Sequence, residues 1–320
     1  MHTPKHGQSI NFRRPKPRFY VAIALIFGIV FFVHHAIIAH QSESNHPSAQ
    51  PDTAQVIQTR QNKVQKELNA YLKKVTADGT ATVSFYDLGA KSGSTAAKSK
   101  VLNKFYKRGE FAASSRGHTA EIAASTYKLY IAAYTFHMIH ENAFTFNDTS
   151  KSSFEQMIVD SLNDFADDHL ETWGMSNVDA YLKKQGWYSP VFLESRPAQT
   201  TALSLTSALK DLHDGSGPYQ NKSERKWLLS LMGKQIYRKG IPTGAKEAKA
   251  GTTVTDKVGF YDDENNDAGI VTLPNGEQYI LVVMTHGHEQ TGLSGFPRIA
   301  KIAKHVQQIV YSDSLTKGLK

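Results

Sequence analysis

The chain has 320 residues, 40% of them hydrophobic and 10% aromatic, so it can bury the core of one large domain or two medium ones. It contains no cysteine, which excludes disulfides and thiolate metal sites. The net charge of +8 does not indicate a nucleic-acid-binding surface, because residues 1–40 carry five Lys and Arg and no acid. Removing those five from 37 leaves 32 bases against 29 acids, and we expect no nucleic-acid partner.

A continuous apolar run follows the basic residues at the N-terminus. Residues 19–33 read "FYVAIALIFGIVFFV", and after two histidines the run resumes as "AIIA". The total is near the ~20 residues that cross a bilayer. Since the basic residues precede the run, we expect 1–18 to be a cytoplasmic tail, 19–39 a single membrane anchor, and the rest to lie outside the cell. The alternative is a cleaved signal peptide ending near Ala39, which would export the same domain.

Residues 40–59 are polar, include two prolines and show no periodicity, which predicts a disordered linker. Six of the 14 histidines precede residue 47, without the spacing of metal ligands. We therefore expect no metal and no cofactor.

The remaining elements follow from hydrophobic periodicity. A helix is expected near 64–75, a strand over 80–88, and a second strand within 109–115. Residues 120–235 carry mostly helical signals. Strands return at 253–261, 268–273 and 278–285, with a turn at 274–278, and a final helix has an apolar stripe of Ile299, Ile302, Val306, Ile309 and Val310.

The two groups of strands must pair across the helical block. This order predicts one α+β domain over 60–315, with α/β parts at about 60–118 and 236–315 and a helical part at about 119–235. The first and last helices would cover one face of the sheet.

Ser125 and Lys128 are three residues apart in the apolar run "ASTYKLY", and that spacing places both on one face of a helix. Burial lowers the pKa of a lysine, and the neutral amine can then take the proton of a hydroxyl. The alternative is that Lys128 extends along a helix flank to water. The spacing alone does not decide, since it recurs at Ser207/Lys210, Ser223/Lys226 and Ser314/Lys317.

Two further motifs follow in a definite order. Ser161-Leu162-Asn163 lies in the helical block, and Lys257-Val258-Gly259 lies on a predicted strand. Together with Ser125 and Lys128 they resemble the serine β-lactamase and penicillin-binding protein superfamily, most closely the class A β-lactamases, over most of residues 60–312. The resemblance implies an antiparallel sheet covered by the N- and C-terminal helices, with an inserted all-helical domain.

The resemblance also implies roles for the residues of the three motifs. Ser125 would be the acylated nucleophile, and Lys128 would activate it. Ser161 would pass a proton to the leaving nitrogen, while Asn163 would orient Lys128 and the substrate amide. The alternative for Ser161 and Asn163 is a helix-turn role toward backbone groups.

The resemblance places Lys257 beside Ser161 and the substrate carboxylate, although it could instead be a charge on a strand edge. The backbone amides of Ser125 and Phe260, with Gly259 beside them, would form the oxyanion hole.

Four positions depart from the family pattern. Leu162 replaces an aspartate, Val258 replaces a hydroxyl residue that binds the substrate carboxylate, and 262–267 lacks the arginine of many relatives. The only acid in the loop that normally carries the deacylating glutamate is Glu194. It is either a substitute base or a surface acid, and the solvated reading is favoured.

Two classes of function are consistent with these residues. The first is an exported, membrane-anchored serine acyl hydrolase, either a β-lactamase with an acyl-enzyme on Ser125 or a peptidase of D-alanyl-D-alanine-type amides. Its partner would be a β-lactam or a peptidoglycan stem peptide, and we expect a monomer. The second is a non-catalytic wall-binding or sensor domain of the same fold.

Overall fold

The computed structural model describes residues 53–319. The predicted basic tail, the anchor and most of the linker lie outside these residues. In the part of the chain that is described, no helix is both long and apolar enough to span a bilayer.

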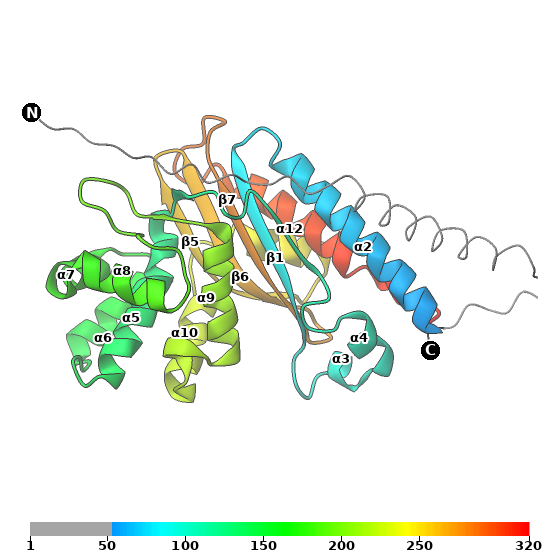
Figure 1. Cartoon of the computed structure of the whole chain (residues 1–320), viewed down its shortest axis with the longest axis horizontal. Helices are drawn as coiled ribbons and strands as arrows, with labels where there is room; N and C mark the ends of the chain where they lie inside the picture. The colour runs from blue at the N-terminus through cyan, green and yellow to red at the C-terminus, as the bar shows by residue number, and fades with distance from the viewer. Residues whose placement is uncertain (1–52, 320) are drawn as a thin grey trace, which may run out of the picture. The chain divides into compact units, whose positions relative to one another are not determined.

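Five antiparallel strands form the central sheet, in the order β2-β1-β7-β6-β5 (Figure 1). Strand β7 lies between the first strand of the chain and the later pair, so both predicted strand groups enter one sheet. The bounds are β1 Ala81–Ala90, β2 Ala112–Ser115, β5 Thr253–Tyr261, β6 Glu264–Thr272 and β7 Glu277–Thr285. A second, two-stranded sheet pairs β3 Glu121–Ile122 with β4 Gln199–Thr200.

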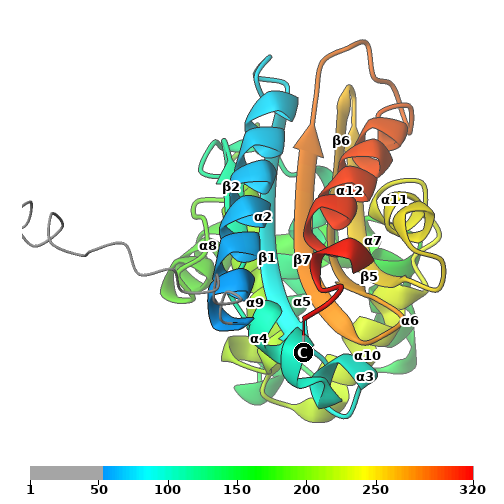
Figure 2. The same ribbon diagram turned by 90° about the vertical axis from the view of Figure 1, so that its right-hand side faces the viewer.

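One face of the large sheet is covered by α2 Thr53–Val75, α11 Ile241–Ala248 and α12 Phe296–Val310 (Figure 2). The apolar residues of α2 and α12 bury against alternate residues of the strands, as expected for helices with one apolar stripe. The expected covering of the sheet by the first and last helices is therefore confirmed.

The predicted linker over 40–59 was wrong at its C-terminal end, because α2 begins at Thr53. Ile57 is only 6% exposed and extends the stripe of Val64 and Leu68 by two turns. Gln61, between them, is also buried and donates to the carbonyl of Phe105. Burial against the domain, which the local sequence did not reveal, adds these residues to the helix.

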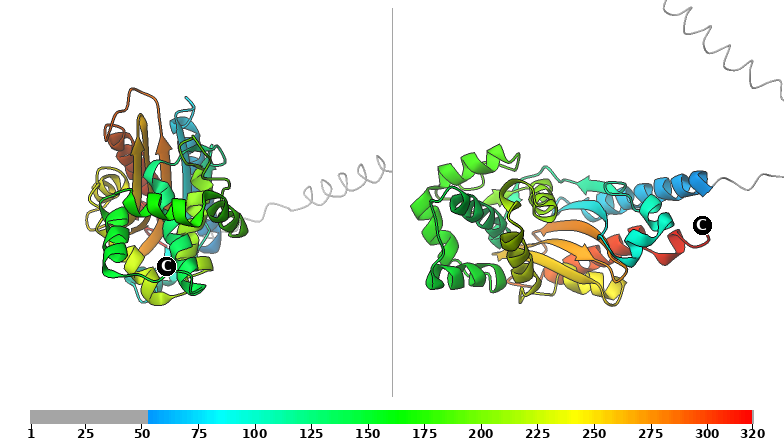
Figure 3. Two further views of the ribbon diagram at one scale, coloured as in Figure 1. Left: turned by 90° about the vertical axis from the view of Figure 1, so that its left-hand side faces the viewer. Right: turned by 90° about the horizontal axis from the view of Figure 1, so that it is seen from below.

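The other face of the sheet carries the helical region (Figure 3). Helix α9 contacts β1, β6 and β7 directly, and the remaining helices pack around it and around the buried α5. The bounds are α5 Lys128–His140, α6 Asp148–Val159, α7 Asp164–Trp173, α8 Met175–Lys184, α9 Ala202–Asp214 and α10 Lys222–Gly233. Short helices α3 Thr95–Lys98 and α4 Lys100–Phe105 follow β1, and the 3₁₀ turns are η1 Ala124–Tyr127, η2 Gly217–Tyr219 and η3 Asp313–Leu315.

Candidate active site

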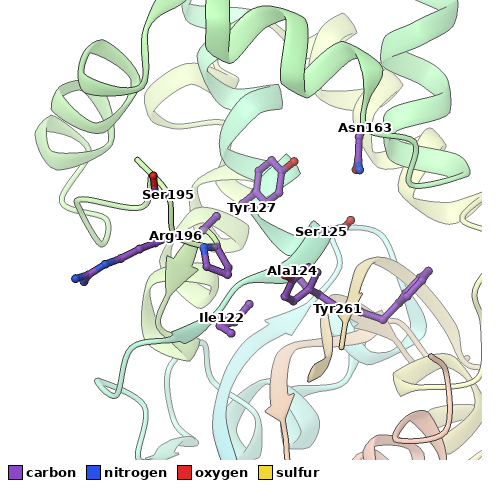
Figure 4. Close-up of a pocket in the computed structure, with 11 residues that line it drawn as sticks. Ile122, Ala124, Ser125, Tyr127, Asn163, Ser195, Arg196 and Tyr261 are labelled. Carbon is purple, nitrogen blue, oxygen red and sulfur yellow. The ribbon is translucent and has the colours of Figure 1, made fainter. Parts of the chain in front are cut away.

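Ser125 lies on η1, immediately before α5, and lines a cavity of about 440 Å³ (Figure 4). The backbone of this turn is constrained, since Ala124 has a φ of 43°, a conformation that is uncommon outside glycine. From β6, the amide of Asn266 donates to the carbonyls of Ile122 and Ala123 at 2.8 and 3.1 Å. The sheet thereby fixes the position of the serine.

Lys128 is completely buried beneath Ser125. Its Nζ donates to Ser125 Oγ at 3.0 Å and, at 2.6 Å each, to the carbonyl of Ser161 and to Asn163 Oδ1. The alternative in which Lys128 extends to water is therefore wrong. Burial lowers the pKa of Lys128 to about 8, although the negative charges of Asp167 and Asp164 oppose the shift. A neutral fraction near neutral pH lets the amine accept the serine proton.

Ser161 and Asn163 lie between α6 and α7, where Ser161 has a φ of 65°. Asn163 is the N-cap residue of α7, yet its side chain makes no capping hydrogen bond and instead holds Lys128. The helix-turn alternative is thus wrong for the Asn163 side chain. Strained backbone of this kind is often found at functional sites.

Lys257 belongs to β5, the edge strand on this side of the sheet, but it is completely buried. Its Nζ donates to Ser161 Oγ at 2.7 Å and to the carbonyl of Val258 at 3.0 Å. The alternative of a solvated strand-edge charge is wrong. Burial, with the nearby charge of Lys128, holds the pKa of Lys257 well below its usual value, against the opposing charges of Asp256 and Asp267.

Gly259 allows the backbone of β5 to approach the nucleophile. A Cβ at this position would lie 2.7 Å from the amide nitrogen of Ser125 and 2.9 Å from that of Thr126. Any side chain here would force the strand away from the serine. Phe260, the next residue, lines the same cavity as Ser125.

Glu194 lies in the exposed turn of the loop between α8 and β4. Its neighbours Ser195 and Arg196 line the cavity, whereas Glu194 does not (Figure 4). No Asp or Glu of residues 53–319 is among the residues that line this cavity. Likewise, these residues contain no group of three or more His, Cys, Asp or Glu placed to hold a metal ion.

Sequence reasoning missed two residues that support the site. Besides Asn266, the buried Asp179 of α8 accepts hydrogen bonds from the backbone amides of Val191 and Phe192, the nearer at 2.7 Å, and so holds the loop. In both cases the signal was a polar residue within an apolar or strand-forming segment. Such a residue needs hydrogen-bond partners once it is buried.

The comparisons with known proteins are consistent with this geometry. Residues 154–311, which include the second and third motifs, match the model of the Beta-lactamase enzyme family. No curated protein sequence matches the chain. Among solved structures, a variant of PBP-A in an acyl-enzyme complex with penicillin G is 20% identical, with a TM-score of 0.57 over 83% of this chain and 98% of that one.

Two β-lactamases show the same likeness. The enzyme from Sphaerobacter thermophilus is 16% identical, with a TM-score of 0.60 over 77% of this chain and 97% of that one. The TLA-1 extended-spectrum enzyme is 18% identical, with a TM-score of 0.59 over 77% and 98%. Residues 154–311 therefore match the model of the β-lactamase enzyme family, and the chain has the fold of these β-lactamases and of PBP-A.

Proposed function

We propose that the protein is a serine acyl hydrolase that forms an acyl-enzyme on Ser125 with β-lactams. The observation that carries this proposal is the buried Lys128, whose Nζ lies 3.0 Å from Ser125 Oγ. A hydroxyl beside an amine of lowered pKa is the arrangement that activates a serine nucleophile.

The proposed first step uses only groups of this chain and the substrate. Neutral Lys128 takes the proton of Ser125, and Oγ bonds to the substrate carbonyl carbon. The backbone amides of Ser125 and Phe260 stabilise the oxyanion. The C–N bond then breaks, and its nitrogen receives a proton from the Ser161 hydroxyl, which recovers one from Lys257, whose Nζ donates to Ser161 Oγ, while Lys128 keeps the proton of Ser125.

Hydrolysis of the acyl-enzyme needs a group that removes a proton from water. Glu194 is exposed and does not line the cavity. Among the described residues, no carboxylate lines it. We propose that this second step is therefore slow.

A chromogenic β-lactam mixed with the protein is expected to give a burst of about one product per chain, followed by a slow steady phase. General base catalysis contributes roughly 10²–10⁴-fold, and the steady phase lacks that factor. Glu194→Gln should leave both phases unchanged. If turnover were instead fast and showed no burst, and if this turnover collapsed in Glu194→Gln, Glu194 would be the deacylation base.

Acylation also distinguishes an enzyme from a non-catalytic domain of the same fold. Burying Lys128 and Lys257 lowers stability, and a domain that only binds wall material needs neither beside a serine. A peptidase of D-alanyl-D-alanine-type amides would use the same first step, so acylation by a β-lactam is common to both kinds of enzyme.

The membrane-anchored, extracellular location belongs to this proposal and rests on residues 13–39 of the sequence alone. Protease added to intact cells should then digest the domain. Full-length protein that is protected within the cytosol would contradict this location.

A further inference from the structure

A second cavity, of about 350 Å³, is a groove between α2 and α12, on the face of the sheet opposite the helical region (Figure 2). The end of α2 lies beside the first half of α12 there, and each helix contributes one stripe of residues at helical spacing. The charged and aromatic members of the two stripes are Tyr71, Lys74, Arg298, Lys301 and His305. None of them lines the active-site cavity.

The groove is positively charged. Lys74, Arg298 and Lys301 line it, and no acid is among its lining residues. Arg298 donates to the carbonyl and the hydroxyl of Thr80, which fixes its guanidinium, and it lies 3.5 Å from the carboxylate of Asp78. No ion pair within residues 53–319 involves Lys74 or Lys301. Two cations of the groove therefore remain available to an anion, for which phosphate is a strong partner.

Apolar and aromatic groups line the rest of the groove. Ile302 is buried and Val75 is half-buried. The rings of Tyr71 and His305 stack with their centres 5.0 Å apart, so this pair connects the two helices. Burial raises the pKa of Tyr71 to about 12, and its protonated hydroxyl can donate a hydrogen bond. A ligand that joins an anionic group to an apolar part would use both kinds of lining.

The position of the groove along α2 favours a ligand at the membrane surface. Residues 40–52 separate the predicted anchor from α2, and a chain of this length spans at most roughly 43–47 Å. Tyr71 lies roughly 27 Å along α2 from Thr53. The tether is thus long enough for this face to lie against the bilayer. Basic and aromatic side chains are the groups that bind the head-group layer.

We infer that the groove between α2 and α12 binds the phosphate of an anionic phospholipid. Lys74, Arg298 and Lys301 would surround the phosphate, while Val75 and Ile302 contact the glycerol and the first methylene groups. This inference goes beyond the proposed hydrolase activity and rests on the proposed membrane-anchored location. The helical region, on the opposite face of the sheet, would then be directed away from the membrane.

The absence of cysteine allows a single fluorescent label to be placed beside the groove. Ala77, which is exposed and lies two residues beyond Val75, is replaced by cysteine in the full-length protein, which is then labelled and reconstituted in vesicles. Energy transfer from the label to an acceptor lipid measures how much of the domain is docked on the bilayer. We expect more transfer with about four parts phosphatidylcholine to one part phosphatidylglycerol than with phosphatidylcholine alone.

Lysine variants assign the docking to the groove. Lys74→Gln combined with Lys301→Gln should lower the ratio of docked to undocked domain by at least about fivefold, the contribution of one basic residue near an anionic surface. Lys222→Gln combined with Lys226→Gln is the matched control, because it removes two exposed lysines of α10 and changes the net charge equally. This control should leave the ratio unchanged. Both double variants should react with benzylpenicillin like the unaltered protein, since neither pair lines the active-site cavity.

Equal transfer in the two kinds of vesicle would overturn the inference. An equal loss of transfer in the two double variants would also overturn it, because net charge rather than the groove would then cause the docking. If the protein did not float with vesicles of either composition, the proposed anchor would fail, and the inference with it. The reaction with benzylpenicillin tests the hydrolase activity independently of all three outcomes.

Discussion

Replacing Ser125 by alanine is expected to abolish the covalent adduct with benzylpenicillin in a protein that remains folded. Ser125 supplies the only oxygen that would form the acyl bond, and its hydroxyl hydrogen-bonds to the buried amine of Lys128. Labelling with a fluorescent penicillin, followed by denaturing electrophoresis, measures the loss. Circular dichroism shows whether the fold is intact.

Two serines with the same spacing to a lysine are matched controls. Ser207 lies on α9, where the ammonium of Lys210 is placed 4.2 Å from the centre of the Tyr86 ring rather than on the serine. Ser223 is exposed at the start of α10. Ser207→Ala and Ser223→Ala should label like the unaltered protein. An adduct that persists in folded Ser125→Ala protein would require another nucleophile.

Replacing Lys128 by methionine is expected to slow acylation by about 10²–10⁴-fold, the usual contribution of a general base. Methionine has a similar length but accepts no proton, and the variant leaves Ser125 and Ser161 in place. A urea unfolding curve identifies any loss of stability. A rate that is unchanged in the folded variant would exclude Lys128 as the base.

The pH dependence tests the same role. Burial lowers the pKa of Lys128 to about 8, so the neutral amine becomes the major form as the pH rises through that value. Acylation by the unaltered protein should therefore accelerate with rising pH through about 8 and then level off. The methionine variant should lose this rise, and a flat profile in the unaltered protein would contradict the assignment.

The predicted strand 253–261 coincides with β5, and of the predicted apolar stripe of the last helix Ile299, Ile302, Val306 and Val310 are buried while Ile309 is half-buried. Local periodicity was sufficient for the last helix, because one face of it packs on the sheet. The order of the three motifs indicated that Ser125, Lys128, Ser161, Asn163 and Lys257 would meet, and the structure brings them together.

Polar residues with long-range partners were harder to interpret. The predicted strand at 268–273 omitted 264–267, yet β6 begins at Glu264, and Asn265, Asn266 and Asp267 are all buried. Asn266 is accommodated through its hydrogen bonds to the turn that carries Ser125. Such partners depend on the tertiary fold, which local alternation cannot report. The same holds for Glu194, whose exposure depends on how Asp179 holds the loop.

The most direct test of the acyl-enzyme is the mass of the intact protein after mixing with benzylpenicillin and removal of the excess. The expected result is one adduct per chain, which peptide mapping assigns to Ser125 and which persists after the free compound is gone. An unmodified mass in a folded protein, or an adduct on any other residue, would contradict acylation by the pair of Ser125 and Lys128.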